Sequence, residues 1–287
     1  MNIAVFADVH GRILLAFMLC ARWEQETGQR IDLILQAGDL GVFPDSAALD
    51  KATRRFASVD PTELGFMNGF HDFKPQVAQI LERTQTNLVF VRGNHEDHAW
   101  LDAREAATGD AIFPVDAYRR VWLLRTGAPY SFTAGDGIIT TLGVGRIGAP
   151  AGEDDDQKPK YIQQREAERL YDLGNQPINV LLTHDARRNF MIPGAGLDEI
   201  GMLLDQERPA YHFFGHYGGP CRITTDTNGV TLSCKLADLH WDRSDRGGRV
   251  EACSMGILRW HDADDHDFIV VDELWLREYT EHTWRHL

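Results

Sequence analysis

Side chains that could bind a metal follow several apolar runs of the sequence, at the point where each run ends. They are Asp8 and His10 after residues 3–7, Asp39 after 33–37, Asn94 and His95 after 88–91, His184 after 178–183, and His216 after 211–215. Carboxylate, amide and imidazole groups without a thiolate suit Mn, Fe, Zn, Ni or Mg. In open α/β sheets, ligands bind outside the carboxyl ends of the strands. The pattern therefore predicts one metal site at these strand ends.

The spacing of these residues favours a site for two ions. Asp8 and His10 alternate across Val9, so in an extended strand end their side chains point the same way. Two ions about 3.5–4 Å apart can share a bridging carboxylate and clamp a phosphoryl group, and Asp39 is the natural bridge. Each residue alone is weak evidence, but Gly-Asn-His-Glu at 93–96 should occur by chance in roughly one chain per thousand of this length.

The elements that must position these residues alternate along the chain. Helical spacing over 13–26, 46–58, 75–85 and 159–172 separates the apolar runs, which predicts an α/β core. In the last third, two strand pairs are expected, one around Asn228-Gly229 and one formed by 251–260 and 267–276. They predict a second, more antiparallel sheet packed on the first. No low-complexity linker interrupts the sequence, so residues 1–287 are expected to form a single domain.

Composition limits the classes of function. The chain has 287 residues, 43% of them hydrophobic, and no apolar run of transmembrane length, so no membrane association is expected. The four cysteines form no Cys-x-x-Cys pair, and the N-terminus lacks a basic region of the kind that begins a signal peptide. Both observations predict a cytoplasmic protein. The net charge of −14 disfavours broad capture of nucleic acid.

The segment 59–74 has no clear period and carries two glycines among four bulky apolar residues. Two interpretations stay open: a mobile lid over a site, or a loop whose aromatic side chains fill the edge of the core.

The motifs together resemble those of the calcineurin-like metallophosphoesterases. They are Asp8-x-His10, Gly38-Asp39, Gly93-Asn94-His95-Glu96, His184 and Gly215-His216. The resemblance implies an α/β fold in the form of a four-layer α/β/β/α sandwich, with two mixed sheets flanked by helices.

The same resemblance implies roles for individual residues. Asp8 and His10 would hold the first metal, Asp39 would bridge, and Asn94, His184 and His216 would hold the second. Catalysis would rest on Asp39 and on His95, which would protonate the leaving oxygen or stabilise charge in the transition state. A phosphate mono- or diester would be hydrolysed by attack of a metal-bridging hydroxide. The expected cofactors are two divalent metal ions, manganese before Fe, Ni, Zn or Mg. The expected partner is a phosphate-ester substrate, either a small molecule or a phosphoprotein.

The sequence departs from the common pattern at two positions. Many members have Gly-His-x-His, whose second His completes the first metal, but that position is Gly218 here. The first metal would then have three protein ligands, and weaker occupancy is expected. Phosphoprotein phosphatases carry an Asp three residues after the bridging Asp, and Val42 stands there in this chain. Asp45 and Asp97 are the candidates to orient His95 in its place.

Arg92, Arg187 and Arg188 are candidates for binding substrate phosphate, although each is equally explained as a surface or strand-end charge. The segment around Arg187 also resembles lariat-debranching RNA phosphodiesterases. An RNA-directed diesterase and a non-catalytic scaffold with the same fold therefore stay open as alternatives to a general phosphoesterase.

Overall fold

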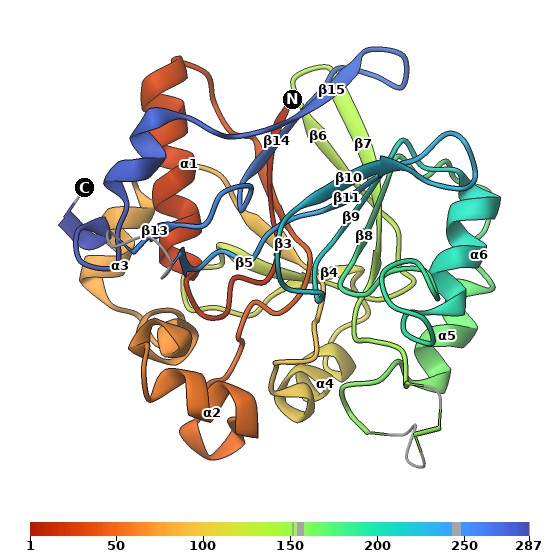
Figure 1. Ribbon diagram of the computed structural model, residues 1–287, viewed down its shortest axis with the longest axis horizontal. Coiled ribbons are helices and arrows are strands. Elements are labelled where there is room, and N and C mark those ends of the chain that lie inside the picture. The colour runs from red at the N-terminus through yellow and green to blue at the C-terminus, as the bar shows by residue number, and fades with distance from the viewer. Residues whose placement is uncertain (151, 154–157, 243–247, 287) are drawn as a thin grey trace.

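Two large mixed β-sheets, flanked by helices, form the fold. The structure is a computed structural model that describes residues 1–150, 152–153, 158–242 and 248–286. The first sheet has the order β15-β14-β1-β2-β3-β5-β4 and the second the order β10-β11-β9-β8-β7-β6. Figure 1 shows α1 and α3 on one side of the sheets and α5 and α6 on the other, which gives the predicted α/β/β/α layers.

The bounds of the strands and helices are as follows. The first sheet contains β1 (Asn2–Phe6), β2 (Leu33–Gln36), β3 (Leu88–Phe90), β4 (Ile112–Pro114), β5 (Val121–Leu124), β14 (Gly256–Trp260) and β15 (His266–Val270). The second contains β6 (Tyr130–Ala134), β7 (Gly137–Val144), β8 (Val180–Thr183), β9 (Tyr211–Phe214), β10 (Arg222–Thr225) and β11 (Leu232–Lys235). A small ribbon pairs β12 (Trp241–Asp242) with β13 (Arg249–Val250). The helices are α1 (Ile13–Thr27), α2 (Lys51–Ala57), α3 (Pro75–Leu81), α4 (His98–Ala106), α5 (Gln164–Leu170) and α6 (Asp198–Glu207).

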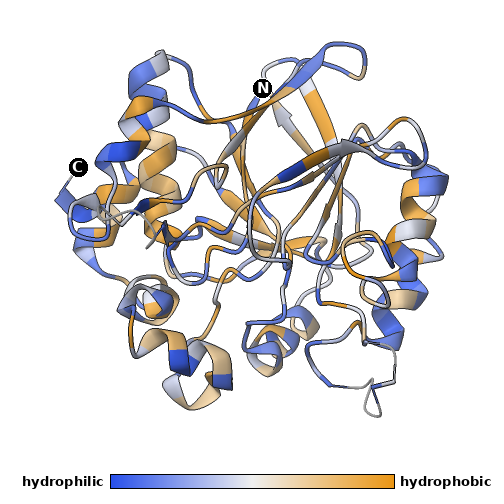
Figure 2. Cartoon of the chain, in the orientation of Figure 1, coloured by the Kyte–Doolittle hydropathy of each residue, from blue (hydrophilic) through white to orange (hydrophobic). Residues whose placement is uncertain are grey.

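Strand β1 shows why the sheets stack in this way. Because side chains alternate along a strand, Ile3 and Val5 enter the core between the two sheets, while Ala4 and Phe6 enter the core under the helices. All four are fully buried. Figure 2 shows the same pattern as hydrophobic colour in the central strands and hydrophilic colour on the outer helices. A strand buried on both faces must be apolar throughout, as IAVFA is.

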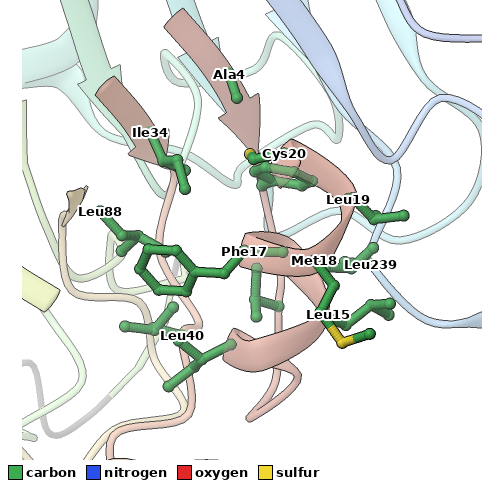
Figure 3. Packing of buried hydrophobic residues seen from close by; sticks show 14 of the residues in the cluster. Ala4, Leu15, Phe17, Met18, Leu19, Cys20, Ile34, Leu40, Leu88 and Leu239 are labelled. Carbon is green, nitrogen blue, oxygen red and sulfur yellow. The ribbon is translucent and has the colours of Figure 1, made fainter. Parts of the chain in front are cut away.

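Helix α1 anchors the layer that covers the first sheet. Its side chains Phe17 and Cys20 lie toward β1, β2 and β3, where Ile34 and Leu88 lie close to Phe17 (Figure 3). Burying one such large side chain contributes about 1.5–3 kcal/mol. On the far side, α5 and α6 cover the second sheet through a separate apolar cluster. These two outer layers hold the strand ends in fixed positions.

The structure confirms both predicted strand pairs of the last third but corrects their place. Strands β10 and β11 pair around the Asn228-Gly229 turn and join the second sheet. Strands β14 and β15 pair with each other, and β14 then pairs antiparallel with β1 in the first sheet. The expectation that the last third forms the second sheet is therefore wrong, because its two hairpins extend different sheets.

Two further expectations are settled by side-chain burial and capping. The predicted helix over 46–58 is interrupted, because Asp50 caps a new helix, α2, by accepting hydrogen bonds from Ala52 and Thr53 N–H. In 59–74, Phe66 and Phe70 are buried in the core, 0% and 1% exposed. These two aromatic side chains of the segment thus fill the core, whereas Phe73 is 61% exposed. Among the described residues, no helix is long and apolar enough to cross a membrane.

Candidate metal centre and catalytic site

The predicted ligands follow strands of both sheets. β1, β2 and β3 are parallel neighbours in the first sheet, and β8 and β9 are parallel neighbours in the second. One ligand atom each from Asp8, Asp39 and His184 lies within 4.8 Å of the others. The site therefore lies where carboxyl ends from two sheets meet, and not in a crevice of one open sheet.

The backbone is strained at four of these ligands. Asp8, His10, Asp39 and His216 have φ angles of 47°, 44°, 53° and 69°, which residues other than glycine rarely adopt. Such conformations cost on the order of 1–3 kcal/mol each and persist where the surrounding structure enforces them. Here these conformations turn the backbone sharply just after β1, β2 and β9.

Glycines next to the ligands leave room for other ligands. A Cβ on Gly93 would lie 2.0 Å from Asp39 Oδ1, and one on Gly215 would lie 1.9 Å from Asp8 Oδ2. A Cβ on Gly38 would lie 2.5 Å from the His184 side chain. The Gly-Asp, Gly-Asn and Gly-His pairs of the sequence thus have a steric reason.

We call Asp39, Asn94, His184 and His216 the His184 half of the site. His184 is fully buried, and its Nε2 lies 3.0 Å from Asn94 Oδ1 and 3.3 Å from Asp39 Oδ2. Its Nδ1 contacts the carbonyl of Ala37 at 2.9 Å, which directs Nε2 toward the ligands. The ring of His216 lies 5.0 Å from that of His184, centroid to centroid.

We call Asp8, His10 and Asp39 the His10 half. His10 Nε2 lies 4.0 Å from Asp8 Oδ1 and 3.8 Å from Asp39 Oδ2. On the other side of the ring, Nδ1 lies 3.9 Å from Glu63 Oε2, a buried oxygen without a hydrogen-bond partner. Glu63 is thus placed to accept a hydrogen bond from Nδ1 when Nε2 binds a metal.

The charges of the site suit bound cations. Burial raises the pKa of Asp8 to about 8, although the charge of His184 lowers it. Burial, and to a smaller extent the charge of His184, lower the pKa of His216 to about 4. The pKa of His184 shifts the other way. Burial lowers it, but the charge of Asp39 and the hydrogen bond to Asp39 outweigh burial and raise the pKa to about 10. Metal binding must therefore displace protons from Asp8 and His184 near neutral pH. The donor set fits divalent ions, since buried carboxylates without cations are costly.

His95 lies beside the metal ligands without being one of them. Its backbone N–H donates to Asp39 Oδ1 at 2.7 Å, and its ring lies 5.6 Å from the ring of His10. Its Nδ1 contacts Asp50 Oδ2 at 2.8 Å. Burial lowers the pKa of His95, but the hydrogen bond to Asp50 and the charge of Asp39 raise it to about 9. The imidazole is therefore protonated at pH 7 and can act as an acid.

The residue that orients His95 is Asp50, not Asp45 or Asp97 as expected. Asp45 caps a short 3-10 helix through Ala47 N–H, and Asp97 caps α4 through Trp100 N–H. Asp50 caps α2 with Oδ1, which leaves Oδ2 for His95. The expected helix over 46–58 placed Asp50 in its interior, and neither its capping position nor its contact with His95, 45 residues away, was predicted from the sequence.

Glu96, the last residue of the Gly-Asn-His-Glu motif, has a structural role that the sequence did not reveal. Its two buried carboxylate oxygens accept hydrogen bonds from Leu40 N–H at 2.9 Å and Val42 N–H at 2.6 Å. Leu40 directly follows Asp39. Glu96 therefore ties the loop after β2 to the loop after β3 and fixes Asp39 relative to Asn94 and His95.

With this geometry established, comparison with known proteins identifies the family. A family model described as calcineurin-like phosphoesterase matches residues 1–219, which include every predicted ligand. The chain belongs to this family. Membership in this family supports the general class of metal-dependent phosphoesterases, which are hydrolases. No curated protein matches the chain.

Solved structures agree with the calcineurin-like fold. The protein TT1561 of Thermus thermophilus is 16% identical with a TM-score of 0.51, and the alignment covers 94% of this chain and 98% of that one. The sulfate thiohydrolase SoxB of Thermus thermophilus, crystallised with glycerol, is 11% identical with a TM-score of 0.46, covering 94% of this chain and 56% of that one. At such low identity the first similarity shows the fold alone.

The three arginines considered as phosphate ligands are paired with carboxylates in this calcineurin-like domain. Arg92 is 2% exposed and contacts Asp102 and Glu105, both at 2.7 Å. Because Arg92 is buried, the alternative that it is a strand-end charge facing solvent is wrong. Arg187 contacts Asp205 and Asp226, and Arg188 contacts Asp198. These ion pairs favour structural roles, and phosphate binding by the three arginines stays a prediction.

A cleft of about 550 Å³ opens beside the His10 half. Its lining includes His10, Glu63, Asp238, Arg55, Phe56 and Trp241. Phe56 is 47% exposed and belongs to α2, the same helix that Asp50 caps. A cleft of this size, next to the helix that Asp50 caps, is large enough for a small-molecule group.

Proposed function

We propose that this calcineurin-like phosphoesterase hydrolyses a phosphate mono- or diester with two divalent metal ions, manganese being the expected ion, and with His95 as general acid. The observation that carries the proposal is the proximity of donor side chains that follow five strands. Asp8, Asp39 and His184 offer ligand atoms within 4.8 Å of one another. His10 lies near Asp39, Asn94 near His184, and the ring of His216 beside that of His184. The imidazole of His95 lies beside this group. A cytoplasmic location and a small-molecule or phosphoprotein substrate are part of the same proposal.

The donor set supports two ions with one shared ligand. Asp39 lies between the halves, with Oδ2 at 3.8 Å from His10 Nε2 and 3.3 Å from His184 Nε2. Asp8 and His10 would hold one ion with Asp39, and Asn94, His184 and His216 would hold the other. When bound, such ions activate water and neutralise phosphate charge.

The ion pairs of the three arginines with carboxylates also favour phosphate binding by metal ions. Since the guanidinium groups of Arg92, Arg187 and Arg188 are engaged with carboxylates, they contribute little positive charge to a substrate phosphate. The negative charge of the phosphate would then be met by the ions and by the protonated ring of His95. An RNA-binding site, by contrast, would need free basic side chains along its surface.

His95 carries the step that the chain itself performs. Its ring is held by Asp50 through Nδ1, so Nε2 is the nitrogen that donates a proton to the leaving oxygen. The carboxylate of Asp50 fixes the ring and stabilises its positive charge. The backbone contact of His95 N–H with Asp39 Oδ1 places this acid directly beside the bridging ligand.

A substrate panel tests the proposal. Purified protein would be assayed with an aryl phosphate monoester, an aryl phosphate diester, nucleotides, and linear and 2′,5′-branched RNA, each with Mn, Fe, Ni, Zn and Mg. We expect Mn-dependent hydrolysis of an aryl ester, and a kcat about 10²–10⁴-fold lower in His95→Asn with its metal content unchanged. His282→Asn, at an exposed site, is the matched control.

Three outcomes would contradict the proposal or change it. Hydrolysis by His95→Asn at the wild-type rate would refute the role of His95. No bound transition metal and no hydrolysis of any ester would favour the non-catalytic scaffold. Cleavage of the branched oligonucleotide in preference to the linear one would favour an RNA-directed diesterase.

A further inference from the structure

The His10 half has fewer candidate ligands than the His184 half, and the loop expected to supply another one carries Gly218 at that position. Gly218 is exposed, and a Cβ built on it would meet nothing within 4 Å. The fully buried Lys235 holds this loop by donating from Nζ to the carbonyls of Gly218 at 2.8 Å and Gly219 at 2.7 Å. At Gly218 the loop after His216 therefore has no side chain to offer to an ion.

Asp238 reaches the same half from another direction. Ala7 and Asp238 form an isolated parallel bridge, and the next residue, Leu239, donates its N–H to the carbonyl of Asp8 at 3.1 Å. Asp238 also lines the cleft that begins at His10. The backbone thus brings an additional carboxylate next to the end of β1, where Asp8 and His10 stand.

The side chain of Asp238 has an unfilled bonding capacity. Its Oδ1 is buried and has no hydrogen-bond partner. A buried acceptor without a partner costs about 1–3 kcal/mol, and more when it is charged, so native structures normally satisfy it. A divalent cation would satisfy Oδ1 directly.

The buried ammonium of Lys235 does not satisfy Asp238. Its Nζ donates to the backbone carbonyls of Gly218, Gly219 and Pro220. Oδ1 of Asp238 is thus left without a partner among the described residues.

We propose that the carboxylate of Asp238 supplies the ligand that Gly218 cannot, and so completes the coordination of the ion held by Asp8, His10 and Asp39. This inference rests on the proposed function in requiring two ion sites. Replacing an imidazole by a carboxylate makes this half richer in oxygen. Such a site favours hard ions, Mn²⁺ or Mg²⁺, over Zn²⁺.

Manganese titration of the full chain tests the assignment, with free Mn²⁺ followed by its paramagnetic resonance signal. We expect two ions per wild-type chain. In Asp238→Asn, one ion should bind as before and the other at least about tenfold more weakly. Asp272→Asn, at an exposed position, is the charge-matched control. Two ions of wild-type affinity in Asp238→Asn would overturn the inference.

A second variant keeps the test decisive if Asp238→Asn fails to fold. Gly218→His places an imidazole on an exposed loop with open space around it, so folding is retained. If Asp238 already fills the position, Mn affinity in Gly218→His changes by less than about twofold. If the position is open, the added ligand tightens one ion by about tenfold or more, and the inference is wrong.

The same samples separate this inference from the proposed function. The proposed function fails if wild-type protein carrying two ions hydrolyses no member of the ester panel, whatever the titration shows. The assignment of Asp238 fails if wild-type protein binds a single ion and gains the second only with Gly218→His.

Discussion

His184 and His10 each hold one half of the candidate metal site, but their surroundings differ in burial and in what fixes the ring. The His184 side chain is fully buried, and both ring nitrogens have polar contacts at 2.9–3.0 Å. The His10 side chain is 20% exposed, and its nearest carboxylate oxygens lie at 3.8–4.0 Å. The side chains of the His184 half are already in contact with one another, while those of the His10 half lie farther apart and border the cleft.

This difference follows from the elements that build each half. The His184 half lies where β2 and β3 of the first sheet meet β8 and β9 of the second, so packed strands enclose it on several sides. The His10 half lies at the end of β1 and faces the 59–74 segment and α2. A buried, preformed half suits tight metal binding, and a half open to a cleft suits the arrival of substrate. The following predictions test this division.

Asp39→Asn should have the largest effect, because Asp39 is the ligand that both halves share. We expect the affinity for both ions to fall at least about a hundredfold, and ester hydrolysis to fall with it. Metal content after dialysis against limiting manganese measures the loss. Retention of one ion at wild-type affinity would show that Asp39 serves a single half.

Gly93→Ala should also damage both halves, since the added Cβ would lie 2.0 Å from Asp39 Oδ1 and 2.2 Å from Asp39 N. We expect a loss of about 1–3 kcal/mol in the free energy of unfolding, together with weaker metal binding. Gly218→Ala is the matched control, because its Cβ meets nothing within 4 Å and should change stability by less than about 0.5 kcal/mol. Urea denaturation measures both variants, and equal stability would refute the steric argument.

Asp50→Asn should alter catalysis while leaving both halves of the metal site intact. Without this carboxylate, the pKa of His95 falls from about 9 toward its ordinary value of 6.5. A general acid is active while protonated, so the alkaline decline of kcat should move to lower pH, with kcat at pH 8 reduced on the order of tenfold. A pH–rate profile checks this with Asp45→Asn as control. An unshifted alkaline limb would exclude Asp50 as the partner of His95.

Glu63→Gln should have the smallest effect and should separate the two halves. Glu63 Oε2 lies 3.9 Å from His10 Nδ1, while Oε1 accepts a hydrogen bond from Arg12 at 3.0 Å, so this carboxylate is placed to orient one ligand of one ion. We expect about tenfold weaker binding of one manganese ion and unchanged binding of the other. Calorimetric titration resolves the two events. Equal weakening of both ions would mean that Glu63 supports the fold and not the His10 half.

Much of the fold and most of the metal site followed from local patterns in the sequence. Apolar runs of four to six residues predicted the central strands β1, β2, β3, β8 and β9, because these strands are buried on both faces and must be apolar throughout. The turn at Asn228-Gly229 predicted its hairpin correctly for the same local reason. The assignment of strands to sheets was not local, and the expectation for the last third was wrong.

The partners of site residues were also beyond local patterns. Asp50 was expected inside a helix over 46–58, yet it caps α2 with one oxygen and contacts His95 with the other. Arg92 stands beside the Gly-Asn-His-Glu motif and was a reasonable phosphate ligand, but α4 supplies two carboxylates that bind it. Such pairings depend on how helices pack over the sheet, and sequence distance carries no information about them.

The sequence by itself determined the chemistry: carboxylate, amide and imidazole donors at strand ends, with glycines that leave room between them. Tertiary structure alone decided which donors form each half and which side chains orient them. The physical reason is that ligand identity depends on residue type, while coordination depends on the packing of two sheets from distant parts of the chain. Asp238 illustrates the second case, because only the bridge to Ala7 brings its carboxylate to the end of β1.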